Sequence, residues 1–212
     1  TCATTMKTPM IVKRSTATNS PAVWHQATPT RPAPPPAVRP VRSAGSPRIH
    51  GFAERLAYSE QYGNDWWIPI YRRAFPTLMS AVAVQADGWA QRGGIDRLLT
   101  LACGRTFTVD EKIRSEDWPD VLLERWSNEK TQTPGWVQKP LAADFIAYAY
   151  APAATCVLLP VPALQRAWRQ HGRQWIGLYG QRRALNDRYT SVSVPVPRGV
   201  LMQAIVEAMF VS

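Results

Sequence analysis

Cysteine is scarce in this chain, and its three copies, Cys2, Cys103 and Cys156, lack the paired spacing of structural zinc and iron–sulfur sites. Long apolar runs are also missing, since no segment approaches the roughly 18 residues that cross a bilayer. The first residues, TCATTMKTPMIVKRS, lack the continuous apolar block of a secretory signal. We therefore expect a reducing, cytoplasmic setting and no membrane partner.

Several common catalytic patterns are missing as well. The sequence has no G-x-S-x-G elbow for a serine nucleophile and no glycine-rich phosphate loop. Its three histidines, His25, His50 and His171, have no partner at metal-ligand spacing. Histidine-based catalysis, serine or cysteine nucleophiles and P-loop chemistry are therefore not expected.

Lysine is rare too, and arginine carries most of the positive charge. The chain has 25 basic residues against 15 acidic ones, a net charge of +10, and only five of the basic residues are lysine. The basic excess lies at both ends, in residues 1–50 and 161–212, around a mildly acidic middle. Guanidinium groups suit phosphate contacts because they are planar and always charged. A GC-rich genome would produce the same bias, so composition alone leaves nucleic acid open.

Proline marks the domain organisation. Residues 1–50 contain TPTRPAPPPAVRPVRSAGSPR, which has no apolar period and predicts a disordered basic arm. Such an arm would either track DNA or act as a plain linker. We expect one folded domain over residues 51–212.

Hydrophobic patterning predicts an α/β fold with a mixed sheet. Helices are expected at 51–63, from about Pro140, at 161–180 and at 198–210. The aromatic segment around Pro69 is expected to be irregular. The segment RYTSVSVPVP predicts an edge strand, because proline donates no ladder hydrogen bond. The other expected strands are Thr77–Asp87, Ile95–Leu101, Arg105–Ile113, Asp120–Ser127 and TCVLLPVP.

The strands around Cys103 form a predicted hairpin with charges at one end. In the second of these strands Asp110 and Lys112 point to the same face, while Glu111 points to the apolar face. A three-residue loop with Gly104 at a positive-φ position would place Asp96 opposite Asp110. A two-residue turn would instead pair Asp96 with Glu111, so the register decides which charges converge.

Two carboxylates and a lysine on one sheet face suit a specific chemistry. Carboxylate oxygens are ligands for Mg²⁺, which keeps several waters and needs few protein ligands. Without a cation, two neighbouring aspartates repel and one tends to be protonated. The structural alternative is a solvated, charged end of a sheet. We take Asp96, Asp110 and Glu111 as candidate metal ligands, with Mg²⁺ as the expected ion and Mn²⁺ as its substitute.

GID at the head of one strand and VDEK at the end of the next resemble the PD-(D/E)XK nuclease superfamily, which has a restriction-endonuclease-like αβββαβ core. The resemblance implies a Mg²⁺-dependent deoxyribonuclease, an endonuclease rather than an exonuclease, with Asp96 and Asp110 as ligands and Lys112 beside the attacking water. It also implies an assisting acid on the first helix, Glu54 or Glu60. Ile95 replaces the family's proline, and the strand DVLLE is an addition that leaves the role of Glu124 open.

The C-terminal basic residues complete the sequence-based hypothesis. We expect them to contact DNA phosphates without reading sequence, and a homodimer is one arrangement to test. The rival hypothesis is a non-catalytic nucleic-acid-binding protein, or an accessory protein of a virion or mobile element, that keeps a nuclease-like fold. The expected DNA-binding residues are Lys139, Arg166, Arg169, Arg173, Arg182 and Arg183.

Overall fold

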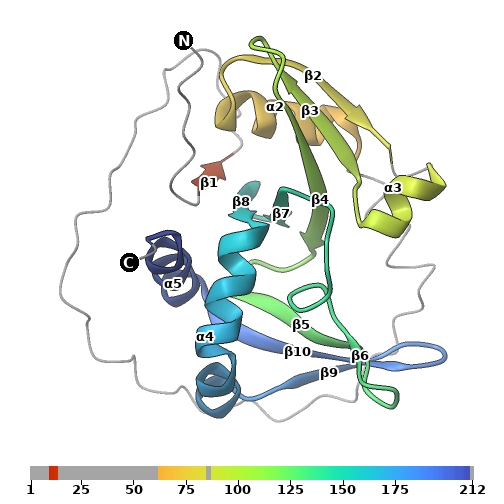
Figure 1. The fold of residues 1–212 in the computed structure, drawn as a ribbon, viewed down its shortest axis with the longest axis vertical. Coiled ribbons are helices and arrows are strands. Elements are labelled where there is room, and N and C mark those ends of the chain that lie inside the picture. The colour runs from red at the N-terminus through yellow and green to blue at the C-terminus, as the bar shows by residue number, and fades with distance from the viewer. Residues whose placement is uncertain (1–9, 14–61, 85–86, 211–212) are drawn as a thin grey trace.

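The computed structural model describes residues 10–13, 62–84 and 87–210 of the chain. These residues contain strands and helices in a mixed order, with a run of strands in the middle of the chain (Figure 1). The elements are β1 (Met10–Lys13), α2 (Asn64–Ala74), β2 (Leu78–Ala83), α3 (Gly88–Gly93), β3 (Arg97–Leu101), β4 (Thr106–Arg114), β5 (Asp120–Asn128), β6 (Thr133–Pro134), β7 (Phe145–Tyr150), β8 (Thr155–Pro160), α4 (Val161–Tyr179), β9 (Arg182–Leu185), β10 (Thr190–Pro197) and α5 (Arg198–Met209).

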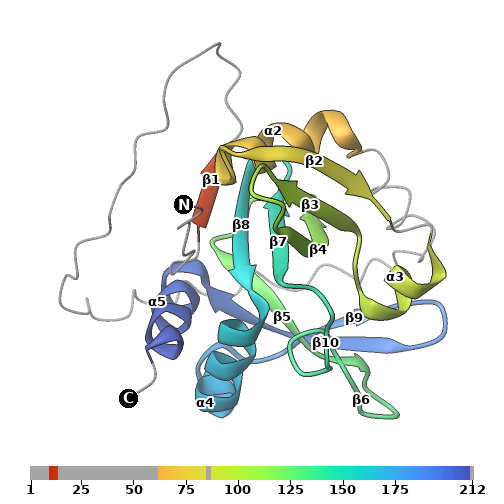
Figure 2. The ribbon, with the colours of Figure 1, turned by 45° about the horizontal axis from the view of Figure 1, so that its top comes forward.

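The strands form two sheets. The larger sheet has six strands in the order β1-β8-β7-β4-β3-β2 and is mixed, because β4 and β7 run parallel while the other neighbours are antiparallel. The smaller sheet is antiparallel, in the order β6-β5-β10-β9. Figure 2 shows α2 next to both edge strands of the larger sheet, β1 and β2, whereas α4 and α5 lie beside the smaller sheet.

The central strand β7 divides the core because all six of its side chains are buried. Ile146, Tyr148 and Tyr150 pack in a cluster with the small sheet, α4 and α5. Phe145, Ala147 and Ala149 pack on the opposite face with the aromatic side of α2. The larger sheet is thus covered on both faces at β7, whereas its edge strand β2 is largely exposed.

The structure confirms the α/β class and most predicted elements, including the strands on either side of Cys103 and the helices α4 and α5. None of the helices in the described ranges is long and apolar enough to cross a membrane.

The prediction of an irregular aromatic segment around Pro69 is wrong, because Asn64–Ala74 forms the helix α2 with Pro69 inside it. An interior proline costs a helix about 3 kcal/mol. Here that cost is offset by burial of Trp67, Ile70 and Tyr71, which are almost fully covered. Tertiary packing therefore overrides the local signal.

The predicted helix from Pro140 is also wrong, because Phe145–Tyr150 is the strand β7. A continuous apolar run fits a buried helix and a strand covered on both faces equally well. As a result, the connection from β4 to the parallel strand β7 contains β5 and β6 in place of the expected helix.

Two further expectations need correction. Met10–Lys13, inside the predicted disordered arm, forms β1 and pairs with β8. The strand β10 is internal, between β5 and β9. Its pairing with β9 covers only Thr190–Ser193, however, so the half that holds Pro195 and Pro197 has a neighbour on one side alone. The predicted helix at 51–63 falls largely outside the described residues.

Candidate active site

The β3–β4 hairpin has the register that brings two aspartates together. Arg97 pairs with Val109, and the same register carries Leu101 opposite Arg105, where the Leu101 N–H donates to the Arg105 carbonyl at 2.8 Å. Gly104 closes the three-residue loop with φ of +81°. Continued by one residue past the Arg97–Val109 pair, this register places Asp96 opposite Asp110. This is the arrangement that the three-residue loop predicts.

The two carboxylates are close enough for their charges to interact. Asp110 is almost fully buried, and Oδ2 of Asp96 accepts the backbone N–H of Glu111 at 2.7 Å. Burial and the negative charge of Asp110 raise the pKa of Asp96 to about 6, against the opposing effects of the Glu111 N–H and Lys112. The negative charge of Asp110 thus disfavours ionisation of Asp96, and a cation bound beside the two carboxylates would relieve this repulsion.

Lys112 supplies positive charge to this pair. Its Nζ lies 2.5 Å from Oδ1 of Asp110, and its side chain remains 34% exposed. Burial lowers the pKa of Lys112, but the Asp110 carboxylate, with help from Asp96 and Glu124, raises it more, and the net shift is upward. Lys112 is therefore an ammonium group at neutral pH.

A third acid, Glu124, reaches the same place from β5 in the smaller sheet. Its Oε2 accepts the N–H of Trp136 at 3.3 Å. Burial raises the pKa of Glu124, while this hydrogen bond and the charges of Lys112 and Lys139 oppose the rise. Sequence reasoning left the role of Glu124 open, because the packing of one sheet on another has no local signal.

The loop before β3 and the segment after β6 border the site. Gly94 has φ of +68°, and a Cβ added there would lie 3.2 Å from Cδ2 of Leu141 and 3.9 Å from Oδ2 of Asp110. The Gly93 carbonyl accepts the Ala142 N–H at 3.1 Å. Glycine at position 94 thus suits the left-handed backbone and the close approach to Leu141.

Glu111 lies apart from this cluster, although we expected it among the metal ligands. Its Oε1 accepts hydrogen bonds from Tyr71 Oη at 2.8 Å and Arg97 Nε at 2.6 Å, and Arg97 Nη1 donates to Asn64 Oδ1 at 2.7 Å. These bonds hold Glu111 against α2 on the other face of the sheet. The inclusion of Glu111 in the ligand set is therefore wrong, because alternation along β4 separates it from Asp110.

The expected DNA-binding residues divide into two groups. Arg169 and Arg173 are exposed on α4, and Lys139 is exposed beside Glu124. Three other arginines are engaged within the protein. Arg166 donates to the Ala208 carbonyl at 2.8 Å, Arg183 pairs with Glu129 at 2.7 Å, and Arg182 lies 3.6 Å from Asp120.

Among the residues that the structure describes, no group of three or more His, Cys, Asp or Glu side chains is arranged to hold a metal ion. Asp96 and Asp110 form a pair of oxygen ligands, which is compatible with an ion that keeps several waters. Glu54 and Glu60, the acids expected on a first helix, lie outside the described residues.

Comparison with known proteins finds no matching family model, no matching curated protein and no matching solved structure. The chemistry of the site must therefore be argued from its own side chains.

Proposed function

We propose that this protein is a Mg²⁺-dependent deoxyribonuclease of the PD-(D/E)XK type that hydrolyses phosphodiester bonds at the Asp96–Asp110 pair. The observation that carries the proposal is the convergence of Asp96 and Asp110 from two strands, with Lys112 hydrogen-bonded to Asp110. An acid on one strand, followed by acid-x-Lys on the partner strand, is the pattern by which this chain resembles the superfamily.

The donor set fits a hard divalent cation. Both ligands are carboxylates, they are partly withdrawn from water, and the pKa of Asp96 is raised in part by the charge of Asp110. A cation between them would relieve this repulsion. Bound Mg²⁺ would polarise a phosphoryl oxygen and lower the pKa of a water molecule.

The chain's own residues have separable roles in this proposal. Asp96 and Asp110 would hold the ion. Lys112, kept protonated by its acidic neighbours, would donate a hydrogen bond to a phosphate oxygen or to the attacking water and stabilise developing negative charge. The negative charge of Glu124 would help to keep Lys112 protonated.

The larger sheet supports a restriction-endonuclease-like fold in part. The antiparallel run β2-β3-β4, followed by β7 parallel to β4, matches the mixed sheet expected for such a core. In place of the expected crossover helix, the connection from β4 to β7 contains β5 and β6. The strand β5 also carries Glu124, so this difference from the expected core adds an acid to the site.

A non-catalytic nucleic-acid-binding role is the second candidate, and one observation favours it. The 2.5 Å contact between Lys112 and Asp110 neutralises one carboxylate without a metal. A protein that only binds DNA would keep this ion pair as a structural feature.

Nicking of supercoiled plasmid separates the two functions. We expect the wild type to nick in Mg²⁺ and to be inactive in EDTA, and we expect Asp110→Asn to be inactive in both. Asp187→Asn, an exposed acid in the turn before β10, is the matched control and should retain full activity. Absence of nicking by the folded wild type on duplex, branched and single-stranded DNA, with binding retained, would favour the non-catalytic role.

A further inference from the structure

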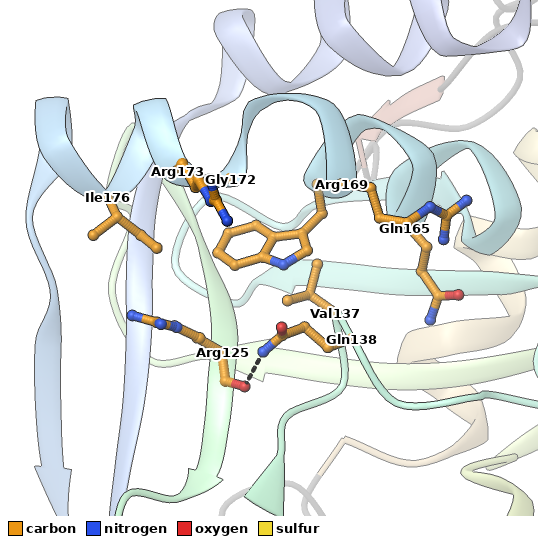
Figure 3. Close-up of a pocket in the computed structure, with 9 residues that line it drawn as sticks. Arg125, Val137, Gln138, Gln165, Arg169, Gly172, Arg173 and Ile176 are labelled. Atoms are coloured by element: carbon orange, nitrogen blue, oxygen red, sulfur yellow. Dashed lines mark hydrogen bonds between the residues drawn. The ribbon is translucent and has the colours of Figure 1, made fainter. Parts of the chain in front are cut away.

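A cavity of about 350 Å³ lies between α4 and the segment that follows β6 (Figure 3). Val137, Trp168 and Ile176 supply its apolar surface, and Val137 and Trp168 are buried. Gly172 also lines the cavity. A Cβ there would lie 3.1 Å from the Trp168 indole, so the absence of a side chain at this position leaves room for the ring.

The polar lining of this cavity is basic. Arg125, Arg169 and Arg173 line it together with Gln138 and Gln165, and none of the lining residues in the described chain is acidic. We call this feature the arginine cleft. Three guanidinium groups around one cavity create a positive potential that favours an anion.

Two of these guanidinium groups are available for a ligand. Arg169 and Arg173 stand one turn apart on α4 and are exposed, and within the described ranges neither has a hydrogen-bond or ion-pair partner. Arg125 is more restrained, because its Nη1 donates to Gln181 Oε1 at 3.1 Å and its guanidinium lies over the Trp126 ring. Arg169 and Arg173 would therefore make the principal contacts.

The arginine cleft and the candidate active site border the same stretch of chain. On one side of it, the Trp136 N–H donates to Glu124. On the other, Nε2 of Gln138 donates to the Arg125 carbonyl at 2.6 Å, and Gln165 Nε2 donates to the Lys139 carbonyl at 2.8 Å. The candidate active site and the arginine cleft therefore lie on either side of residues 135–139, of which Gln138 and Lys139 are exposed.

We infer that the arginine cleft binds one nucleotide of an unpaired DNA strand that continues from the scissile phosphate. Its phosphate would lie between Arg169 and Arg173, and its sugar or base would lie against the apolar surface. The volume of about 350 Å³ is at the lower end of the range for ligand cavities, about 300–1,000 Å³, which suits a single nucleotide. This inference rests on the proposed function for the identity of the strand as DNA, and it narrows the substrate to DNA with an unpaired segment.

The test is fluorescence anisotropy in EDTA with a short fluorescein-labelled single-stranded DNA, the matched duplex and a single-stranded RNA of the same sequence. We expect Arg169→Ala/Arg173→Ala to weaken single-stranded DNA binding about tenfold or more, with a smaller effect on the duplex. The salt dependence of single-strand binding should also fall, by a slope of about 0.7 for each lost phosphate contact.

The control is Arg72→Ala/Arg105→Ala, which removes two exposed arginines, one on α2 and one in the β3–β4 loop, and should leave binding unchanged. Equal losses in both double variants, equal losses for duplex and single strand, or tighter binding of RNA would overturn the inference. A folded wild type that never nicks DNA, combined with single-strand binding that depends on Arg169 and Arg173, would reject the nuclease proposal and retain the cleft.

Discussion

Nζ of Lys112 lies 2.5 Å from Oδ1 of Asp110, and the two residues are neighbours on the same face of β4. Asp96 lies beside this pair, and burial together with the negative charge of Asp110 raises the pKa of Asp96 to about 6, so this acid takes up a proton just below neutral pH. The site thus combines a neutralised carboxylate, a proton-sensitive carboxylate and an ammonium group within two strands.

Replacement of Lys112 separates its chemical role from its structural role. Lys112→Met should lower nicking by about 10²–10³-fold, the usual cost of losing one donor to a developing charge. It should also tighten Mn²⁺ binding, measured by isothermal titration calorimetry, because the carboxylates lose their competing cation. Lys130→Met, at an exposed lysine after β5, should change neither quantity. Unchanged nicking in Lys112→Met would remove Lys112 from the mechanism.

The raised pKa of Asp96 predicts how pH affects the metal-free protein. In the folded state this pKa is about 6, above the ordinary value of 3.8. Between about pH 4 and 6 the folded protein holds a proton that the unfolded chain has released, so the free energy of unfolding falls as pH rises. The contribution should be about 1–2 kcal/mol, because Asp96 is partly exposed to solvent.

Urea unfolding in EDTA at several pH values measures this contribution. Asp96→Asn should flatten the decline between pH 4 and 6, whereas Asp187→Asn should follow the wild type. Glu124 and Glu111 have pKa shifts in the same direction, so the comparison between variants carries the test. Identical pH profiles for wild type and Asp96→Asn would contradict the raised pKa.

Gly94 offers a test of how closely the backbone approaches Asp110. Gly94→Ala should destabilise the protein by about 1–2 kcal/mol from the left-handed backbone alone. The added methyl group would also crowd Leu141 and approach Asp110. Gly104→Ala is the matched control, because Gly104 also has positive φ but has open space around it. Nicking should fall in Gly94→Ala and persist in Gly104→Ala, and equal activity in the two would mean that the site tolerates the methyl group.

Local sequence signals predicted the hairpin and limited its register to two alternatives, but they did not predict its surroundings. The register around Gly104 follows from loop length and glycine conformation, both encoded within a few residues. That register alone places Asp96 opposite Asp110. The arrival of Glu124 depends on one sheet packing against another, for which a single sequence carries no pattern.

The misassigned segments share a physical cause. Around Pro69, burial of aromatic side chains offsets the cost of proline, and at Phe145–Tyr150 a run buried on both faces has no period to identify it. In both segments the long-range environment decides the structure. The superfamily resemblance depends on the hairpin, where local signals are strongest, and the membership itself stays a prediction.

The buried pair Arg97–Glu111 should be the main determinant of stability near the site, because it joins the hairpin to α2. Arg97 is 2% exposed, and its loss in Arg97→Ala would leave the Glu111 carboxylate buried with Tyr71 as its remaining hydrogen-bond donor. Breaking a buried pair in this way costs about 3–5 kcal/mol, measured by urea unfolding. Arg105→Ala, at an exposed position in the same hairpin, should change stability by about 0.5 kcal/mol or less. If Arg97→Ala were as stable as Arg105→Ala, apolar packing alone would hold the hairpin against α2. The position of Asp96 and Asp110 would then not depend on the Arg97–Glu111 ion pair.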